Sequence, residues 1–107
     1  MTNLGPPVPY TIGVWSVKRG RAGDFVAAWT AFAEWTAANV HGAGRGTLLR
    51  DTGDDHRFVS VGPWESLEAI EQWRSHPGWS EHVAAIRELL TSFEPSTLEL
   101  VVERGPS

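Results

Sequence analysis

Six tryptophans are the most informative chemical feature of this 107-residue sequence, in which they make up over half of the aromatic side chains. A chain of this length buries only about 60–65% of its unfolded surface, so its core needs fewer rings than that. Trp64, Trp73 and Trp79 cluster around a strand end and a helix that Pro77 and Gly78 interrupt. A broken helix cannot pack flat along its whole length. These rings therefore either line a pocket for a flat, apolar ligand or fill the gap themselves.

His82 is the candidate proton acceptor, because it lies at the edge of an apolar helical stripe between Trp79 and Ile86. A histidine in this position either packs against the core or lines a cavity, where imidazole can accept a proton. His76 and His82 are six residues apart and cannot bind one metal from one helical face. Cysteine is absent, and the sequence has no dinucleotide-binding loop. We therefore predict no metal site and no bound cofactor.

Charge and hydropathy limit the partners of the chain. Thirteen acidic and nine basic residues give a net charge of −4, without a basic block. We therefore expect binding to neither nucleic acid nor a membrane surface. No apolar run approaches about 18 residues, and the N-terminus lacks the basic and apolar regions of a signal peptide. The sequence thus predicts a cytoplasmic protein.

Hydrophobic periodicity predicts the order βαββαβ. Strands are predicted at 10–17, 47–50, 57–64 and 97–103, and helices at 24–40 and at 66–93 with a break at 76–78. Pro95 is predicted to stop the last helix. This order is typical of an α+β, ferredoxin-like fold with a four-stranded antiparallel sheet and the helices on one face. Residues 1–9 are predicted to form an extended arm and residues 10–104 a single domain.

Both faces of the predicted sheet are apolar. One face is predicted to carry Trp15, Val17, Val59, Val61 and Val101, and the other Ile12, Val14, Phe58, Leu98 and Leu100. A sheet that is apolar on both sides must be covered on both sides. We therefore expect a homodimer that buries the face with Trp15 and Val101.

The stretch Phe-Val-Ser-Val-Gly-Pro-Trp-Glu-Ser at 58–66 carries a family resemblance, together with 69–74, His76-Pro77 and 86–90. It resembles the antibiotic biosynthesis monooxygenase domain family. The resemblance implies a dimeric α+β barrel over nearly the whole chain. Well-understood members oxidise aromatic polyketide phenols to quinones with molecular oxygen and no bound cofactor. The implied partners are thus a small aromatic substrate, molecular oxygen and a second copy of the chain.

The resemblance also implies site residues. Trp64 matches a tryptophan that lines the family's pocket, and Arg87 fits an arginine on the last helix. Ser60 and Ile70 stand where the family has an asparagine and a tyrosine that help to bind or deprotonate the substrate. We expect His82 to accept a proton and Arg87 to stabilise the resulting phenolate or enolate. The expected substrate-binding residues are Trp64, Trp73, Phe58, Trp29, Ser60 and Ile70.

Two alternatives belong to the same fold. A haem-degrading branch has a tryptophan that Trp73 matches, but Val83 stands at its haem-ligating histidine and His82 is one residue out of register. A shift of one residue turns a side chain by about 100° around a helix, so haem degradation is disfavoured. The remaining alternative is a non-catalytic, small-molecule-binding protein or a cyclase-type member of the fold.

Overall fold

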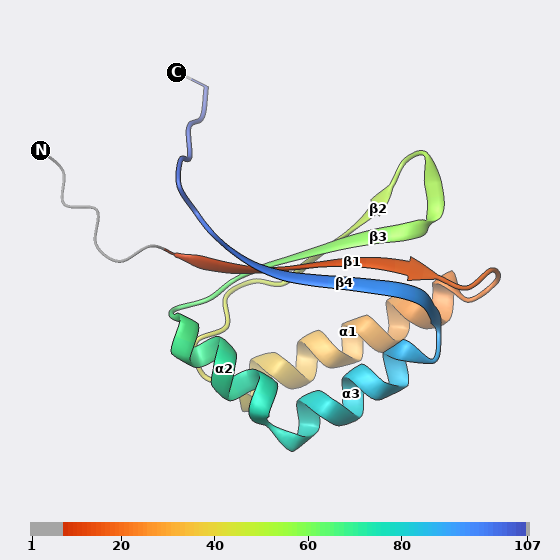
Figure 1. The fold of residues 1–107 in the computed structure, drawn as a ribbon, viewed down its shortest axis with the longest axis horizontal. Coiled ribbons are helices and arrows are strands. Elements are labelled where there is room, and N and C mark those ends of the chain that lie inside the picture. The colour runs from red at the N-terminus through yellow and green to blue at the C-terminus, as the bar shows by residue number, and fades with distance from the viewer. Residues whose placement is uncertain (1–7, 107) are drawn as a thin grey trace, which may run out of the picture.

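Four strands and three helices make up residues 8–106, the part of the chain that this computed structural model describes (Figure 1). In chain order they are β1 (Pro9–Val17), α1 (Ala22–Asn39), β2 (Thr47–Asp51), β3 (Asp54–Pro63), α2 (Leu67–Ser75), α3 (Pro77–Arg87) and β4 (Leu90–Glu99). The strands form one antiparallel sheet in the order β2-β3-β1-β4, and the helices cover one of its faces. The predicted ferredoxin-like α+β fold is confirmed. Most of the predicted N-terminal arm, residues 1–7, lies outside the described residues.

Local capping signals set the ends of α2 and α3. The hydroxyl of Ser66 accepts a hydrogen bond from the backbone N–H of Ala69 at 3.1 Å and caps α2, as predicted. Nδ1 of His76 accepts one from the backbone N–H of Gly78 at 3.0 Å, and Pro77 occupies the first position of α3. The predicted break therefore separates two short helices that meet at an angle (Figure 1). None of the helices in the described residues is long and apolar enough to cross a membrane.

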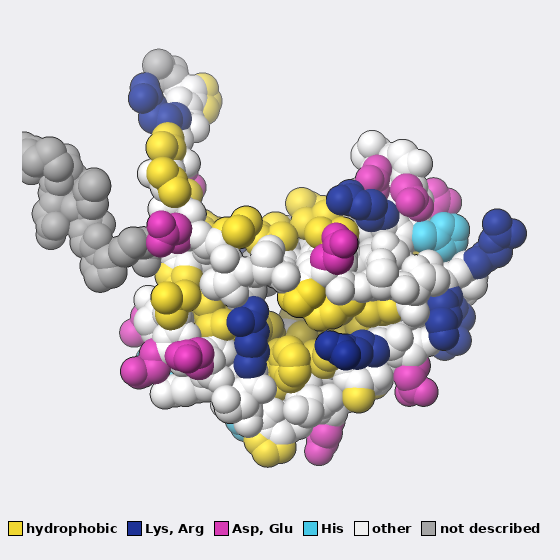
Figure 2. Space-filling model, viewed as in Figure 1, with side chains coloured by type: hydrophobic (Ala, Val, Ile, Leu, Met, Phe, Trp, Pro, Cys, Tyr) yellow, Lys and Arg dark blue, Asp and Glu magenta, His cyan; other side chains and the backbone are white. Residues whose placement is uncertain are grey.

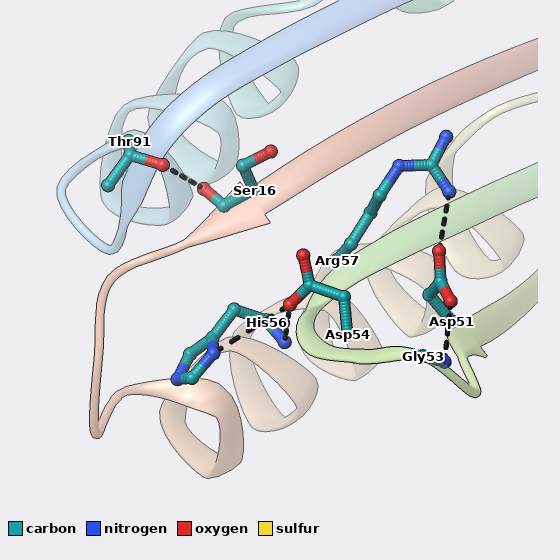
Figure 3. A network of polar contacts seen from close by, with 7 residues as sticks. All are labelled: Ser16, Asp51, Gly53, Asp54, His56, Arg57 and Thr91. Carbon is teal, nitrogen blue, oxygen red and sulfur yellow. Dashed lines mark hydrogen bonds and ion pairs between the residues drawn. The ribbon is translucent and has the colours of Figure 1, made fainter.

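The turn between β2 and β3 is held by two aspartates (Figure 3). The Asp51 carboxylate accepts hydrogen bonds from the Gly53 backbone N–H at 2.7 Å and from Nη1 of Arg57 at 3.1 Å. The hydrogen bond from Gly53 and the Arg57 guanidinium hold the pKa of Asp51 below its ordinary value. The Asp54 carboxylate accepts from the backbone N–H of His56 at 2.9 Å. These carboxylates stabilise the predicted hairpin, whose turn is exposed.

The last helix and the last strand differ from the prediction. α3 ends at residue 87, before Phe93, and β4 spans Leu90–Glu99 instead of 97–103. The apolar spacing of the helix continues into this segment, but Phe93 stacks on Trp15 of the neighbouring strand with ring centroids 4.0 Å apart. Pro95, predicted to stop the helix, lies inside β4. It is tolerated there because β4 is an edge strand and needs no N–H donor on its open side.

The face of the sheet that the helices cover carries Trp15 and Phe58. These two residues pair across β1 and β3 and are 3% and 2% exposed. Because side chains alternate along a strand, Val59 and Val61 point to the opposite face. Val101 lies beyond β4 and is 80% exposed. The predicted grouping of Trp15 with these valines is therefore wrong, and so is the prediction that a dimer buries Trp15.

The face of the sheet away from the helices is apolar and uncovered within the chain. Figure 2 shows apolar side chains on this side, above the sheet. Its centre consists of half-buried residues of β1 and β3: Tyr10, Ile12, Val14, Val59 and Val61. The prediction that both faces are apolar is therefore confirmed, with a different set of residues on each face.

Close packing between α1 and the start of α3 depends on Gly78. The ring of Trp35 lies where a Cβ on Gly78 would be, and it meets the His76 ring edge to face at 4.9 Å. A side chain at position 78 would therefore push Trp35 away from the helix.

We expect Gly78→Ala to lower the free energy of unfolding by about 1–3 kcal/mol, because overpacking forces the Trp35 ring to move. Urea unfolding followed by circular dichroism measures this change. Gly23→Ala is a matched control, because Gly23 is also the second residue of its helix and a Cβ there meets nothing within 4 Å. The control should be unchanged or more stable by about 0.5–1 kcal/mol. Equal stability of the Gly78 variant and the unmodified chain would contradict this packing.

Candidate functional site

A cavity of about 530 Å³ lies between the sheet and the helices. Figure 2 shows it as a hollow below β4, with apolar side chains inside. Small-molecule sites commonly measure about 300–1,000 Å³, so the cavity has room for one such ligand. Its aromatic lining consists of Trp15, Trp29, Phe32, Trp64, Trp73, Trp79 and Phe93. Of the two roles considered for the tryptophans around the broken helix, lining a pocket is the one this geometry supports.

Three indoles of the cavity wall are held in place by hydroxyl groups that also line the cavity. The donor–acceptor pairs are Trp15 Nε1 to Ser60 Oγ at 2.9 Å, Trp64 Nε1 to Thr11 Oγ1 at 3.1 Å and Trp73 Nε1 to Thr36 Oγ1 at 3.0 Å. Leaving a buried N–H without an acceptor costs about 1–3 kcal/mol. Each pair therefore fixes the orientation of one ring, and the walls are formed before any ligand arrives.

Ser60 lies on the sheet floor of the cavity, directly opposite Gly13 in the register of β1 and β3. A Cβ on Gly13 would come within 2.8 Å of both the Ser60 hydroxyl oxygen and Nε1 of Trp15. Glycine at position 13 therefore leaves the space in which the Trp15–Ser60 hydrogen bond forms. Ser60 accepts from Trp15, and its own proton has no acceptor among the described residues. Its hydroxyl is thus free to donate to a ligand.

Trp79 differs from the other indoles of the wall. Its Nε1 is buried and has no hydrogen-bond acceptor among residues 8–106. The ring meets Trp73 edge to face, with centroids 6.1 Å apart and an interplanar angle of 80°. Its backbone N–H donates to the carbonyl of His76 at 3.0 Å, in the first turn of α3. Trp79 is therefore positioned by its helix and by ring packing, without a bond to its indole nitrogen.

The charged residues of the cavity lining are all arginines. Arg45, Arg74 and Arg87 contribute to it, whereas no carboxylate, imidazole, amine or phenol does so in the described part of the chain. Nη2 of Arg74 donates to the Thr97 hydroxyl at 3.2 Å, which ties α2 to β4. The cavity can therefore stabilise an anion but contains no group that would accept a proton from one.

Five residues predicted for the site come together in the cavity lining: Trp29, Ser60, Trp64, Trp73 and Arg87. Two other predicted residues, Phe58 and Ile70, are each 2% exposed and lie in the core. Trp15 lies on the helix-covered face of the sheet. Phe58 pairs with Trp15 across β1 and β3, so it also lies under the helices. Both residues support the cavity from behind instead of lining it.

His82 does not line the cavity. Its ring lies against Phe32 and Trp35, with centroid distances of 5.7 Å and 5.4 Å. His82 and Arg87 are five residues apart on α3, which separates their directions by about 140° around the helix axis. Only Arg87 contributes to the lining. Of the two roles considered for His82, packing against the core is the one that this position favours.

Sequence reasoning missed the sheet floor and one side of the opening. The missed lining residues include Thr11, Gly13, Trp15, Thr36 and Arg74. Thr11, Gly13 and Trp15 alternate along β1, so their shared face was visible in the sequence. Thr11 and Gly13 are small and lie on the inward side of the strand, so they leave space above the sheet. This pattern was the sequence signal for a cavity at this place. Arg74 directly follows the predicted Trp73.

The comparisons with known proteins agree with this fold. Residues 10–88 match the family model described as antibiotic biosynthesis monooxygenase. The chain belongs to this family. A search of curated proteins finds no significant match.

Solved structures similar to this monooxygenase-family chain share its fold. SnoaB, a cofactor-independent oxygenase from Streptomyces nogalater, is 22% identical over 95% of this chain and 100% of its own, with a TM-score of 0.84. A provisionally assigned antibiotic biosynthesis monooxygenase from Caulobacter crescentus is 15% identical over 90% and 92%, with a TM-score of 0.81. A protein from Shewanella oneidensis is 17% identical over 91% and 94%, with a TM-score of 0.80. At these identities, the likeness establishes the fold alone.

We expect Gly13→Ala to break the Trp15–Ser60 hydrogen bond, because the new Cβ enters the space between the two groups. The indole N–H signal of Trp15 in a ¹H–¹⁵N spectrum should then move and exchange faster with solvent. Ser60→Ala should give the same change, since it removes the acceptor at a cost of about 1–3 kcal/mol. Ser16→Ala, on the other face of β1, should leave the signal in place. An unaltered Trp15 signal in both site variants would contradict the bond.

Proposed function

We propose that the chain is a cofactor-independent monooxygenase that oxidises a phenolic or polycyclic aromatic compound with molecular oxygen. The observation that carries this proposal is the cavity, whose walls are aromatic and whose charged residues are all cationic. Membership of the antibiotic biosynthesis monooxygenase family supports oxygenase chemistry. Among the described residues, no group of three or more metal-ligating side chains occurs.

The aromatic walls would hold the flat ring of the substrate. The ring centroids of Trp64 and Trp73 lie 4.8 Å apart and their planes meet at 43°, so together the two rings form a bent apolar part of the cavity wall. Ring stacking against such a surface contributes about 0.5–1.5 kcal/mol for each pair, beyond the burial of apolar area. The hydrogen bonds to Thr11 and Thr36 keep both indoles from rotating into the empty space.

Arg87 and Ser60 would stabilise the substrate anion. The Arg87 guanidinium supplies a fixed positive charge, and the Ser60 hydroxyl supplies a hydrogen-bond donor from the sheet side. Arg87 is exposed at the mouth of the cavity, where solvent screens part of its charge, whereas the Ser60 hydroxyl is half-buried among apolar walls that strengthen its hydrogen bond. Because the described lining contains no proton acceptor, the proton of the phenol or enol would leave to solvent. The acidity of the substrate itself, raised by Arg87, would then limit the reaction.

The oxidation can be written without any further reactant. One electron passes from the substrate anion to molecular oxygen, which gives superoxide and a substrate radical. The two radicals combine to form a carbon–oxygen bond, and protonation gives a hydroperoxide on the ring carbon. Loss of the remaining proton from that carbon breaks the O–O bond and releases water. In sum, a ring CH₂ group and O₂ become a C=O group and H₂O, so substrate carbon is oxidised and oxygen is reduced.

A non-catalytic binding function is the second candidate. The absence of a proton acceptor from the described lining favours it, as do Ser60 and Ile70 at positions where the family has asparagine and tyrosine. Such a protein would bind the same aromatic ligands in the same cavity. The two functions are distinguished by oxygen consumption.

We expect the protein to accelerate the conversion of anthrone to anthraquinone, measured as oxygen uptake and as quinone absorbance above the buffer rate. Trp64→Ala should raise KM about tenfold with little change in kcat, because it removes an apolar wall. Trp64→Phe should raise KM less and protects the test against misfolding of the alanine variant. Leu67→Ala is the control, since Leu67 is 62% exposed and lies outside the cavity.

Binding of anthrone without oxygen uptake above buffer would favour the non-catalytic function. A wild-type rate in both Trp64 variants would contradict the assignment of this cavity as the site.

We also propose that two chains associate through the uncovered face of the sheet, as the dimeric barrel of the family resemblance implies. The half-buried centre of this face is extended by Leu49 and Leu98, which are each 54% exposed. The register places Leu49 beside Val59 and Leu98 beside Tyr10. A second copy presents the same apolar surface, so the two sheets can cover each other symmetrically.

We expect sedimentation at micromolar concentration to give about twice the chain mass of 11.8 kDa. Val59→Lys should give the mass of a single chain, because burying an unpaired ammonium at the centre of the contact is strongly unfavourable. Val26→Lys places the same charge on α1, where Val26 is 40% exposed, and should leave the mass unchanged. A single-chain mass for the unmodified protein would overturn this proposed assembly.

A further inference from the structure

Arg74 and Arg87 mark two ends of the opening of the cavity beside β4. Both line the cavity and both are exposed, so they lie where it meets solvent. Arg87 ends α3 just before β4 begins, whereas Arg74 is tied to Thr97 near the other end of β4. Figure 2 shows basic side chains flanking the hollow below this strand.

The register of β4 separates the two arginines along the opening. Phe93 pairs with Trp15 and Thr97 pairs with Thr11, with Pro95 between them. Four residues of a strand span about 13 Å. Arg74 is held near one end of this strand and Arg87 ends the helix that leads into its other end, so each arginine can serve a different part of a ligand.

Arg74 has no acidic partner. The ion pairs among the described residues use Arg21, Arg57, His41 and His56 as their basic members, and Arg74 is in none of them. Its one hydrogen bond goes to a neutral hydroxyl, that of Thr97. Arg45 and Arg87, the other arginines of the lining, are in none of these ion pairs either, so the contact with Thr97 is what distinguishes Arg74.

The Thr97 contact orients the Arg74 guanidinium. One N–H of Arg74 Nη2 donates to the Thr97 hydroxyl, and the other N–H groups of the guanidinium remain free to bind a ligand. A planar guanidinium with free N–H groups matches the two oxygens of a carboxylate, and such charge-assisted hydrogen bonds are stronger than neutral ones. Thr97 is therefore a positioning residue for Arg74.

We propose that the aromatic substrate carries a carboxylate substituent, which Arg74 binds at the mouth while the ring enters the cavity. This inference rests on the proposed function and adds the class of substrate to it. Arg87 acts on the ring oxygen at the other end of the opening, and Arg74 selects substrates by their acidic group.

The test compares two probes with one tricyclic frame, anthraquinone-2-carboxylate and the neutral 2-(hydroxymethyl)anthraquinone. Quenching of tryptophan fluorescence gives both dissociation constants. We expect the unmodified protein to prefer the carboxylate about three- to tenfold at low ionic strength, and less at high ionic strength. Arg74→Gln should abolish the preference and keep the affinity for the neutral probe. Thr97→Val should reduce the preference in part.

Arg19→Gln removes the same charge at an exposed position away from the cavity and should keep the full preference. Equal affinity of the unmodified protein for the two probes would overturn the inference and leave the proposed function intact. A preference for the carboxylate probe that survives Arg74→Gln would also overturn the inference. The same holds for a preference that only Arg87→Gln removes. Failure of both probes to bind would instead contradict the proposed function, and this inference with it.

Discussion

The hydrogen-bonding requirement of buried indole nitrogens governs the architecture of this cavity. Leaving a buried indole N–H without an acceptor costs about 1–3 kcal/mol, so most buried tryptophans place their N–H against one. In this chain Trp15, Trp64 and Trp73 find theirs on short hydroxyl side chains next to the empty space, not on backbone carbonyls. The rings are thereby turned edge-on to their partners and cannot collapse inward. An apolar cavity of this size persists because its walls are held by polar bonds.

The electrostatics of the site separate two tasks that many enzymes combine. Stabilising an anion needs fixed positive charge, and the arginines at the mouth of the cavity provide it. Creating the anion needs a proton acceptor, which the described lining does not contain. A site of this kind suits substrates that are already acidic, because the protein then only has to favour a form that water can generate. Molecular oxygen, which is small and uncharged, would need no binding group of its own.

Much of the fold could be predicted because it follows from local patterns. The cap at Ser66, the break at His76 and the alternation in β1 each act over a few residues, and each was readable. The errors arose where a tertiary contact decided the outcome. Phe93 fits a helical stripe by spacing, but its stacking on Trp15 draws the segment into the sheet.

The site was predictable to the extent that its residues were aromatic and close to the family motif. Trp64 and Trp73 stood out by type and by their place around the broken helix. Ser60 was expected from the family motif, but its pairing with Trp15 was not. That pairing depends on the register that brings Gly13 opposite Ser60, and register is not encoded in either strand alone. His82 was misleading because periodicity gives the face of a helix but not which neighbour covers it.

β1 serves two surfaces with one strand. The side chains at its odd positions from Thr11 to Trp15 point to the helix-covered face, and those at its even positions from Tyr10 to Val14 point outward. Because this division has a period of two, substitutions can alter ligand recognition without touching the outer face, and the reverse also holds. Insertion or deletion of a single residue within β1 would exchange the two sets at once. Changes in the length of this strand would therefore disturb both surfaces together, whereas a substitution acts on one of them.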